Sequence, residues 1–289
     1  MGNDLIVGTG GALYRLGAEE PELPDPVAAV STDRDDWWAL TEDGRVVRSG
    51  EQAGSLSGVR GRCILPREGD LLIGTSEARL FRLRDRSIEA DRSFDQAPGR
   101  ERWYTPWGGP PDTRSLAADA EGMVYANVHV GGILRGDGDG WQPTIDVDAD
   151  VHQVTAFDGL VLAATAYGVA ISTDRGLTWE MDEDGLHAPY CRAVAVADET
   201  LLTTASTGPF TDRAAVYRRP LAGGTFERCE GGLPEWFPSN IDTHCLVASG
   251  SAAALGTDRG EVWLSPDEGR TWDRVADGWP EIRALAFAS

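Results

Sequence analysis

Two eight-residue stretches, 172–179 (STDRGLTW) and 265–272 (SPDEGRTW), carry serine, aspartate, glycine, threonine and tryptophan at the same five positions. A degenerate copy at 219–226 (RPLAGGTF) keeps a glycine, the threonine and an aromatic residue. The copies begin at residues 172, 219 and 265, so they are 47 and 46 residues apart. Self-similarity at a period of about 40–50 residues is typical of repeat architectures. The spacing therefore predicts a repeated structural unit.

Each fixed position in these stretches suits a tight turn. An aspartate carboxylate can accept backbone N–H groups, a glycine can adopt a positive φ, and a tryptophan can fill the space between neighbouring units. We therefore interpret the repeated pattern as structural. The residues given this role are Ser172, Asp174, Gly176, Trp179, Ser265, Asp267, Gly269 and Trp272.

A cycle of short apolar strands separated by acidic or glycine turns recurs seven times along the chain. The first strand of each cycle mixes small and branched residues, as expected for a strand packed on both faces near an axis. These predicted inner strands are 27–32, 62–67, 114–119, 152–157, 192–197, 244–249 and 283–288. The pattern predicts an all-β fold, a seven-bladed β-propeller with four-stranded antiparallel blades.

The two ends of the chain complement each other. The first hairpin, 5–16, has no inner strand before it, and the last inner strand, 282–288, has nothing after it. Pairing them would remove two open sheet edges, which otherwise invite intermolecular association. We expect residues 1–289 to form one domain closed in this way.

The pattern Ser-x-Asp-x-Gly-x-Thr-Trp resembles the Asp-box, or BNR repeat, of a large group of β-propellers. That group includes sialidases, sortilin-type receptors, photosystem assembly factors and glycosyl hydrolase-like propellers. Segments such as VHVGGILR and GLPEWF resemble those of unassigned prokaryotic members. The resemblance implies that the turn joins the third and fourth strands, on the face opposite the usual ligand mouth. The early Arg-Ile-Pro motif of sialidases is not matched by 62–66 (RCILP).

Composition excludes several classes of function. The net charge of −21 comes from 47 acids against 26 bases, and all of the bases are arginine. This balance argues against nucleic-acid binding, which needs a basic face. It resembles the lysine-poor proteins of salt-in haloarchaea, in which molar salt screens self-repulsion. With no long apolar run, no secretion-like leader and four scattered cysteines, we expect a soluble cytoplasmic protein with reduced, buried thiols.

Charged residues gather at the start of the predicted inner strands. Six of the seven begin with a base: Arg62, Arg114, His152, Arg192, His244 and Arg283. Four have an acid two residues upstream: Asp112, Asp150, Asp242 and Glu281. Residues two apart in a strand point to the same side, so this spacing predicts a ring of alternating charge around one mouth of the channel. One interpretation of the ring is a set of mutual ion pairs, because partly buried charges are normally paired.

The other interpretation is a site for a polar or anionic ligand, since arginine forks and histidines donate hydrogen bonds to anions. The residues predicted to contact the ligand are Asp148, Asp150, His152, His187, Tyr190, Arg192, Asn240, Asp242 and His244, and Arg62, Arg114 and Arg283 complete the ring. We expect Arg114 and Arg283 to be structural, because an acid lies two residues before each. Aromatic loops at 100–111, 206–213 and 233–239 are expected at the rim, with Trp236 and Phe237 exposed.

The favoured function is that of a monomeric binding or scaffold propeller without catalytic residues, metal or cofactor. Its partner would be a protein or a small anionic or carbohydrate-like ligand, and neither nucleic acid nor a membrane. A hydrolase or lyase that acts on a carbohydrate-like substrate, with Asp148, Asp150 or Asp242 as acid or base, is an alternative. It needs two carboxylates about 5–10 Å apart. An assembly factor of the photosystem type is another. A metal held by Asp150, His152, Asp242 and His244 is less favoured, because its ligands would reach across an intervening blade.

Overall fold

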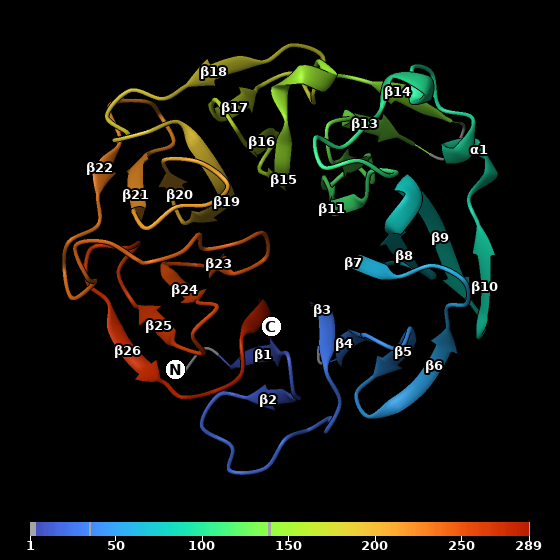
Figure 1. Ribbon diagram of the computed structural model, residues 1–289, viewed down its shortest axis with the longest axis horizontal. Coiled ribbons are helices and arrows are strands. Elements are labelled where there is room, and N and C mark those ends of the chain that lie inside the picture. The colour runs from blue at the N-terminus through green and yellow to red at the C-terminus, as the bar shows by residue number, and fades with distance from the viewer. Residues whose placement is uncertain (1–3, 35, 138–139, 289) are drawn as a thin grey trace.

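Seven antiparallel sheets surround a central axis in the computed structural model, which describes residues 4–34, 36–137 and 140–288 (Figure 1). Residues 1–3, 35, 138, 139 and 289 of the predicted domain lie outside this described part. Six sheets have four strands each, and the sheet that joins the two ends of the chain has three. The predicted seven-bladed propeller is confirmed, with one strand fewer than expected in the closing blade.

The blades are formed by consecutive strands that run from the axis to the rim. In chain order, inner strand first, they are β3 (Val27–Asp33), β4 (Asp36–Thr41), β5 (Arg45–Arg48), β6 (Glu51–Ser55); β7 (Gly61–Arg67), β8 (Asp70–Thr75), β9 (Arg79–Arg84), β10 (Ser87–Ala90); β11 (Thr113–Ala118), β12 (Val124–Val128), β13 (Gly132–Gly136), β14 (Trp141–Pro143); β15 (Val151–Phe157), β16 (Leu160–Thr165), β17 (Gly168–Ser172), β18 (Glu180–Asp182); β19 (Tyr190–Ala197), β20 (Thr200–Ser206), β21 (Ala214–Pro220), β22 (Glu227–Arg228); and β23 (Leu246–Ser249), β24 (Ala252–Gly256), β25 (Val262–Ser265), β26 (Asp273–Ala276). Short helices occupy some connections: η1 (Ser76–Ala78), α1 (Arg92–Asp95), η2 (Arg100–Arg102) and η3 (Val147–Ala149).

The closing blade contains β27 (Ile282–Phe287), β1 (Leu5–Thr9) and β2 (Leu13–Arg15), in that order from the axis. Strand β1 pairs antiparallel with β27, from Leu5 opposite Phe287 to Gly8 opposite Ala284. The expected closure by the C-terminal strand is therefore confirmed. A single bridge between Leu13 and Leu23 stands where a fourth strand would lie. The segment 17–26 contains three prolines, which cannot donate to a ladder, so it does not extend this bridge into a strand.

Six of the seven inner strands have a bulge or register shift near their first residues, and β23 is the exception among the described strands. In β7 and β11, for example, Gly61 and Cys63 pair with consecutive residues of β8, and Thr113 and Ser115 with consecutive residues of β12. The extra residue between them is a predicted ring base. The bases placed in this way are Arg62, Arg114, His152 and Arg283, and Arg192 lies within a similar irregularity. A bulge re-aims the side chain of its extra residue, so these bases depart from simple strand alternation.

The two quoted turns are held by their own side chains. The Asp174 carboxylate accepts the backbone N–H groups of Leu177 and Thr178 at 3.0 and 2.8 Å. The Ser172 hydroxyl accepts the N–H of Gly176 at 2.7 Å, and Gly176 has a φ of +80°. Asp267, Ser265 and Gly269 repeat this arrangement, with matching bonds of 2.8 and 2.9 Å. These turns join β17 to β18 and β25 to β26, the third and fourth strands of their blades.

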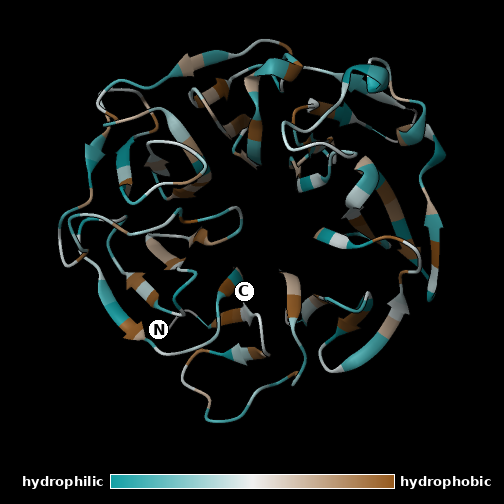
Figure 2. Cartoon of the chain, in the orientation of Figure 1, coloured by the Kyte–Doolittle hydropathy of each residue, from teal (hydrophilic) through white to brown (hydrophobic). Residues whose placement is uncertain are grey.

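Apolar side chains fill the spaces between neighbouring blades. One cluster joins β1 and β27 to the preceding blade through residues such as Leu5, Leu285 and Ala254. Figure 2 shows the hydrophobic residues concentrated in the strands, with hydrophilic residues in many of the connections. All four cysteines are free and buried, as expected. None of the helices in the described part is long and apolar enough to cross a membrane.

Candidate ligand site at the channel mouth

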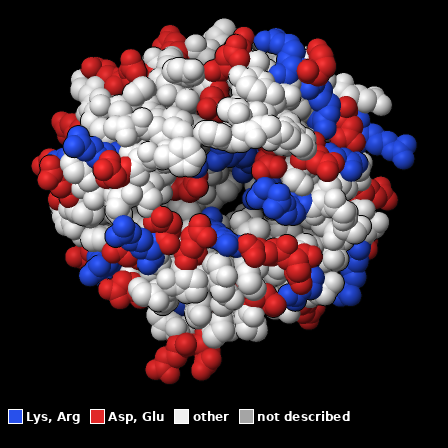
Figure 3. Space-filling model, in the orientation of Figure 1, with Lys and Arg blue, Asp and Glu red and all other residues white. Residues whose placement is uncertain are grey.

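One end of the central channel opens into a cavity of about 720 Å³, called the mouth cavity below. The chain enters the inner strands at this end, so the two Asp174- and Asp267-type turns lie at the opposite end of their blades. Figure 3 shows basic side chains gathered around the central hollow, with acidic side chains beside them. The cavity is lined by five arginines and four carboxylates: Arg60, Arg62, Arg114, Arg192, Arg283, Glu42, Asp112, Asp242 and Glu281. Bases therefore outnumber acids here, although acids dominate the whole chain.

Three of these arginines are paired with acids. The Arg62 Nε atom lies 2.9 Å from Asp112, and Arg192 Nη1 lies 2.8 Å from Asp242. In both pairs the acid belongs to the segment that leads into the next blade. The expected pairing of residues two apart is therefore wrong for Asp112 with Arg114, because Arg114 is the extra residue of a bulge.

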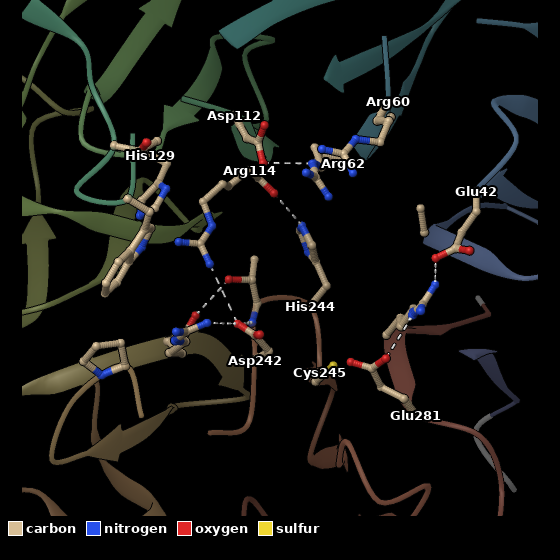
Figure 4. A pocket seen from close by; sticks show the side chains of 18 of the residues that line it. Glu42, Arg60, Arg62, Asp112, Arg114, His129, Asp242, His244, Cys245 and Glu281 are labelled. Atoms are coloured by element: carbon tan, nitrogen blue, oxygen red, sulfur yellow. Dashed lines mark hydrogen bonds and ion pairs between the residues drawn. The ribbon is translucent and has the colours of Figure 1, made fainter. Parts of the chain in front are cut away.

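The third paired base, Arg283, follows the expected pattern in part. Its Nε atom lies 3.3 Å from Glu281, two residues upstream. Its Nη1 atom also contacts Glu42, from the turn after β4 (Figure 4). Arg283 thus links the C-terminal strand to the next blade around the ring.

Arg114 and Arg60 are the exceptions. The Arg114 guanidinium points toward Asp242 across the cavity (Figure 4), but the nearest nitrogen is 3.8 Å from the carboxylate. Within the described residues, Arg114 donates no side-chain hydrogen bond, although only 18% of its side chain is exposed. Arg60 has no ion pair within the same part of the chain. The donor groups of both guanidiniums are therefore available at the mouth.

One carboxylate serves two guanidiniums in the cavity. Burial alone would raise the pKa of Asp242, but Arg192 and Arg114 hold the pKa below its ordinary value. Burial lowers the pKa of Arg114, Asp242 opposes this effect, and nearby Arg192 adds to it. The three groups together carry an excess positive charge. This excess is the electrostatic feature that an anion would recognise.

Tyr190 forms part of the wall beside Arg192. The Arg192 guanidinium carbon lies 5.5 Å from the centre of the Tyr190 ring, and Arg192 Nη2 donates to the phenol oxygen at 3.4 Å. Burial raises the pKa of Tyr190, so the phenol is neutral at pH 7. It can donate its hydroxyl proton to an anionic oxygen.

Two histidines flank Asp150, and one of them is buried against Tyr190. The His152 side chain is fully buried, and its Nδ1 donates to the Cys191 carbonyl at 2.6 Å. Its ring centre lies 4.7 Å from that of Tyr190, with the two rings tilted by 55°. His152 Nε2 and His129 Nε2 lie 3.7 and 3.6 Å from the same oxygen of Asp150. Burial, with Arg114 and Arg192, lowers the pKa of His129 to about 4. Both imidazoles are therefore neutral at pH 7, since burial also lowers the pKa of His152.

His129 lines the cavity, although it is not among the residues that the sequence predicts for the ring or the ligand site. It follows β12, in the connection to β13. The connections between second and third strands lie at the same end of a blade as the start of the inner strand. That topological rule is the signal that could have placed His129 at the mouth.

His244 also lines the cavity, but it precedes its inner strand instead of beginning it. Strand β23 starts at Leu246, and His244 has a φ of +64°. Its Nε2 donates to the Arg114 carbonyl at 3.2 Å, as Figure 4 shows. The His244 imidazole therefore helps to hold the backbone of Arg114 in place.

Several predicted contacts lie elsewhere. Asp148 is exposed on η3, and neither it nor Asp150 lines the mouth cavity. His187 packs 4.7 Å from the Trp236 ring and accepts the Tyr217 hydroxyl, in a separate shallow depression. Phe237 is 2% exposed, so the expected rim position of this side chain is wrong. It pairs with Ala214 through the backbone and belongs to the core.

Asn240 has an indirect place in the site. Its side-chain amide donates to the carbonyls of Gly208 and Pro209, both at 3.1 Å. It therefore braces the 206–213 loop at the mouth. No three His, Cys, Asp or Glu side chains are grouped to hold a metal ion anywhere in the described residues, and this includes Asp150, His152, Asp242 and His244.

Comparisons with known proteins support the fold alone. No protein-family model and no curated protein sequence matches the chain. Similar solved structures include an ancestral GH74 enzyme, with 16% identity and a TM-score of 0.65 over 96% of this chain and 41% of that one. They also include YCF48 bound to a D1 peptide, with 15% identity and a TM-score of 0.58 over 94% and 84%. A chain of the nidogen–laminin complex matches with 13% identity and a TM-score of 0.59 over 100% and 99%.

The chain spans about two fifths of the length of the ancestral GH74 protein that it resembles. Among these three neighbours, one is an enzyme, one is bound to a peptide and one belongs to a protein complex. The shared propeller therefore does not select a function, which has to be argued from the mouth cavity.

Proposed function

We propose that this chain is an Asp-box propeller that binds an organic anion at its channel mouth without catalysing a reaction. The observation that carries the proposal is that the buried guanidinium of Arg114 lacks a hydrogen-bond partner in the part of the chain that the structure describes. Its guanidinium is largely buried, shares Asp242 with Arg192, and makes no side-chain hydrogen bond within the described residues. A buried charge without a close partner is costly unless a bound group satisfies it.

The chemistry of the cavity favours a carboxylate. The planar guanidinium fork matches the two oxygens of a carboxylate, and Arg114, Arg60 and the Tyr190 hydroxyl all offer donors. The cavity volume of about 720 Å³ lies within the range of roughly 300–1,000 Å³ seen for small-molecule sites. A nucleic acid is disfavoured because the whole chain carries a net charge of −21, which repels phosphates.

Hydrolysis by mouth carboxylates is less well supported. Asp242 has a lowered pKa and is held by two arginines, so it is a poor general acid. Asp150 has a raised pKa because of burial, but it lies behind His129 and does not line the cavity. Asp150 therefore does not complete an acid and base pair with Asp242 around a substrate in the cavity. The other carboxylates of the cavity each lie in an ion pair with an arginine: Glu42, Asp112 and Glu281.

The proposal is tested by measuring anion binding to the Arg114→Gln variant by calorimetry at constant ionic strength. The panel is citrate, glucuronate, benzoate, phosphate and sulfate. Arg259→Gln is the matched control, because Arg259 lies in the connection between β24 and β25 at the same face but does not line the cavity. We expect Arg114→Gln to weaken carboxylate binding at least tenfold and the control to change it less than twofold. Equal binding by the two variants, or no measurable binding to the unmodified protein, would overturn the proposal.

A further inference from the structure

Two aromatic side chains stand at the entrance of the mouth cavity. Trp107 is 66% exposed and Phe210 is 87% exposed, and both line the cavity. Their ring centres are 5.6 Å apart in an edge-to-face arrangement. Trp107 comes from the long connection before β11, and Phe210 from the connection between β20 and β21, so the pair joins two non-adjacent blades. Exposed aromatic surface of this kind, beside polar groups in a cavity, is typical of a binding site.

The loops that carry these rings are braced in place. The Thr105 hydroxyl donates to the Gly108 carbonyl at 2.9 Å, which closes the turn containing Trp107. Asn240 holds the carbonyls of Gly208 and Pro209 directly before Phe210. Bracing reduces the ordering cost that a ligand would meet on binding. The loop backbone that carries the aromatic pair is therefore held in place before any ligand arrives.

The same cavity thus offers two kinds of recognition. The guanidinium donors of Arg114 and the Tyr190 hydroxyl line the cavity together with the exposed rings of Trp107 and Phe210. Arginine matches a carboxylate, and an edge or face of an aromatic ring packs well on indole and phenyl rings. With five arginines against four carboxylates, the lining is suited to one negative charge.

We propose that the ligand of the mouth cavity is an aromatic carboxylate, whose carboxylate group pairs with Arg114 while its ring packs against Trp107 and Phe210. This inference rests on the proposed anion site and specifies the chemical class of its ligand. A small molecule fits better than an extended chain, because Arg114 is largely buried and the Trp107 and Phe210 rings, which come from two different loops, contact each other at the cavity. The aromatic rings supply the selectivity that a carboxylate alone would lack.

The test compares 2-naphthoate, propionate and neutral 2-naphthamide as probes, by calorimetry and by competition. The proteins are the unmodified chain, Trp107→Ala and Phe210→Ala, with Tyr167→Ala as the control. Tyr167 is 57% exposed in the connection between β16 and β17 at the same face, but does not line the cavity. Both cavity rings are exposed, so their removal leaves the buried core intact.

We expect the unmodified protein and Tyr167→Ala to bind 2-naphthoate at least tenfold more tightly than propionate, and 2-naphthamide more weakly than 2-naphthoate. Trp107→Ala and Phe210→Ala should each lose most of that tenfold preference while retaining their affinity for propionate. An unmodified protein that binds both acids equally would overturn this inference and leave the anion site standing. Failure of every anion to bind would overturn both proposals. Binding of a carboxylate-terminated peptide but not of 2-naphthoate would replace the small ligand by a peptide partner.

Discussion

Replacing Asp242 with asparagine should lower the stability of the protein and raise its affinity for anions. Asp242 is the carboxylate that Arg192 contacts at 2.8 Å and Arg114 approaches at 3.8 Å. Asparagine keeps a similar shape and an acceptor oxygen but removes the negative charge. The two guanidiniums would then repel each other without compensation, while an added anion would no longer compete with an internal carboxylate.

The magnitudes follow from the exposure of the three side chains. Asp242 is 54% exposed, whereas Arg192 and Arg114 are 16% and 18% exposed. An exposed ion pair contributes about 0.2–1 kcal/mol, and breaking a buried pair costs about 3–5 kcal/mol. This half-exposed arrangement lies between the limits, so we expect a loss of about 1–2 kcal/mol. Removing the competing charge should favour an anion by about 1.4 kcal/mol, which corresponds to roughly tenfold in affinity.

Both quantities can be measured on one preparation. Denaturant unfolding gives the change in stability, and calorimetric titration with benzoate at constant ionic strength gives the change in affinity. Asp182→Asn is the control, because Asp182 pairs with the buried Arg219 at 3.1 Å and does not line the mouth cavity. Weaker binding of benzoate to Asp242→Asn would show that Asp242 does not compete with the anion. Asp242 would then contact the ligand favourably, or the arginines would form an architectural ion-pair ring.

Three further predictions concern the whole molecule. Deleting residues 282–289 should abolish cooperative folding or cause oligomerisation, because β1 loses its partner strand, and a monomeric truncated chain with native melting would contradict ring closure. Dialysis from molar to millimolar salt should lower the melting temperature, because the acidic side chains behind the net charge of −21 then repel one another without screening. A melting temperature that does not depend on salt would contradict adaptation to high salt. The free energy of unfolding should fall as pH is lowered from about 6.5 to about 4. The pKa of His129 is about 4 in the folded state and near 6.5 in the unfolded state, so only the unfolded state takes up a proton in that window. A His129→Gln variant should show a shallower decline in the same denaturant assay, and an unchanged slope would exclude His129 as a cause.

The fold could be predicted because its signals are local. The turn residues around Asp174 and Asp267 carry their own hydrogen bonds, and the unmatched first hairpin and last strand indicate closure. The missing fourth strand of the closing blade has a local cause as well, in the prolines of segment 17–26. Attention to those prolines would have corrected the prediction.

The candidate site was harder to predict because its pairing depends on bulges. Strand alternation placed Arg114 beside Asp112, whereas the bulge turns Arg114 toward Asp242 from a distant blade. The sequence contains no simple mark of such a register shift. His129 was missed for a different reason, since it reaches the cavity from a connection between strands instead of from the start of one.

Long loops were the other source of error. Phe237 lies in a segment rich in proline and aromatic residues, which indicated a rim position, yet its ring packs into the core between two blades. His187 likewise packs on Tyr217 and Trp236, away from the mouth cavity. In contrast, Trp107 and Phe210 lie in loops that were expected at the rim and are exposed there. Only the tertiary contacts of each loop distinguish these cases.

The central claim is that the mouth cavity binds an organic anion at Arg114. A crystal structure of the protein grown with 4-iodobenzoate tests it most directly, because the anomalous scattering of iodine locates the ligand without ambiguity. We expect an iodine peak in the mouth cavity near Trp107 and Phe210, with the carboxylate against the Arg114 guanidinium. Iodine found only outside the cavity, with Asp242 bound closely to both Arg114 and Arg192, would contradict it.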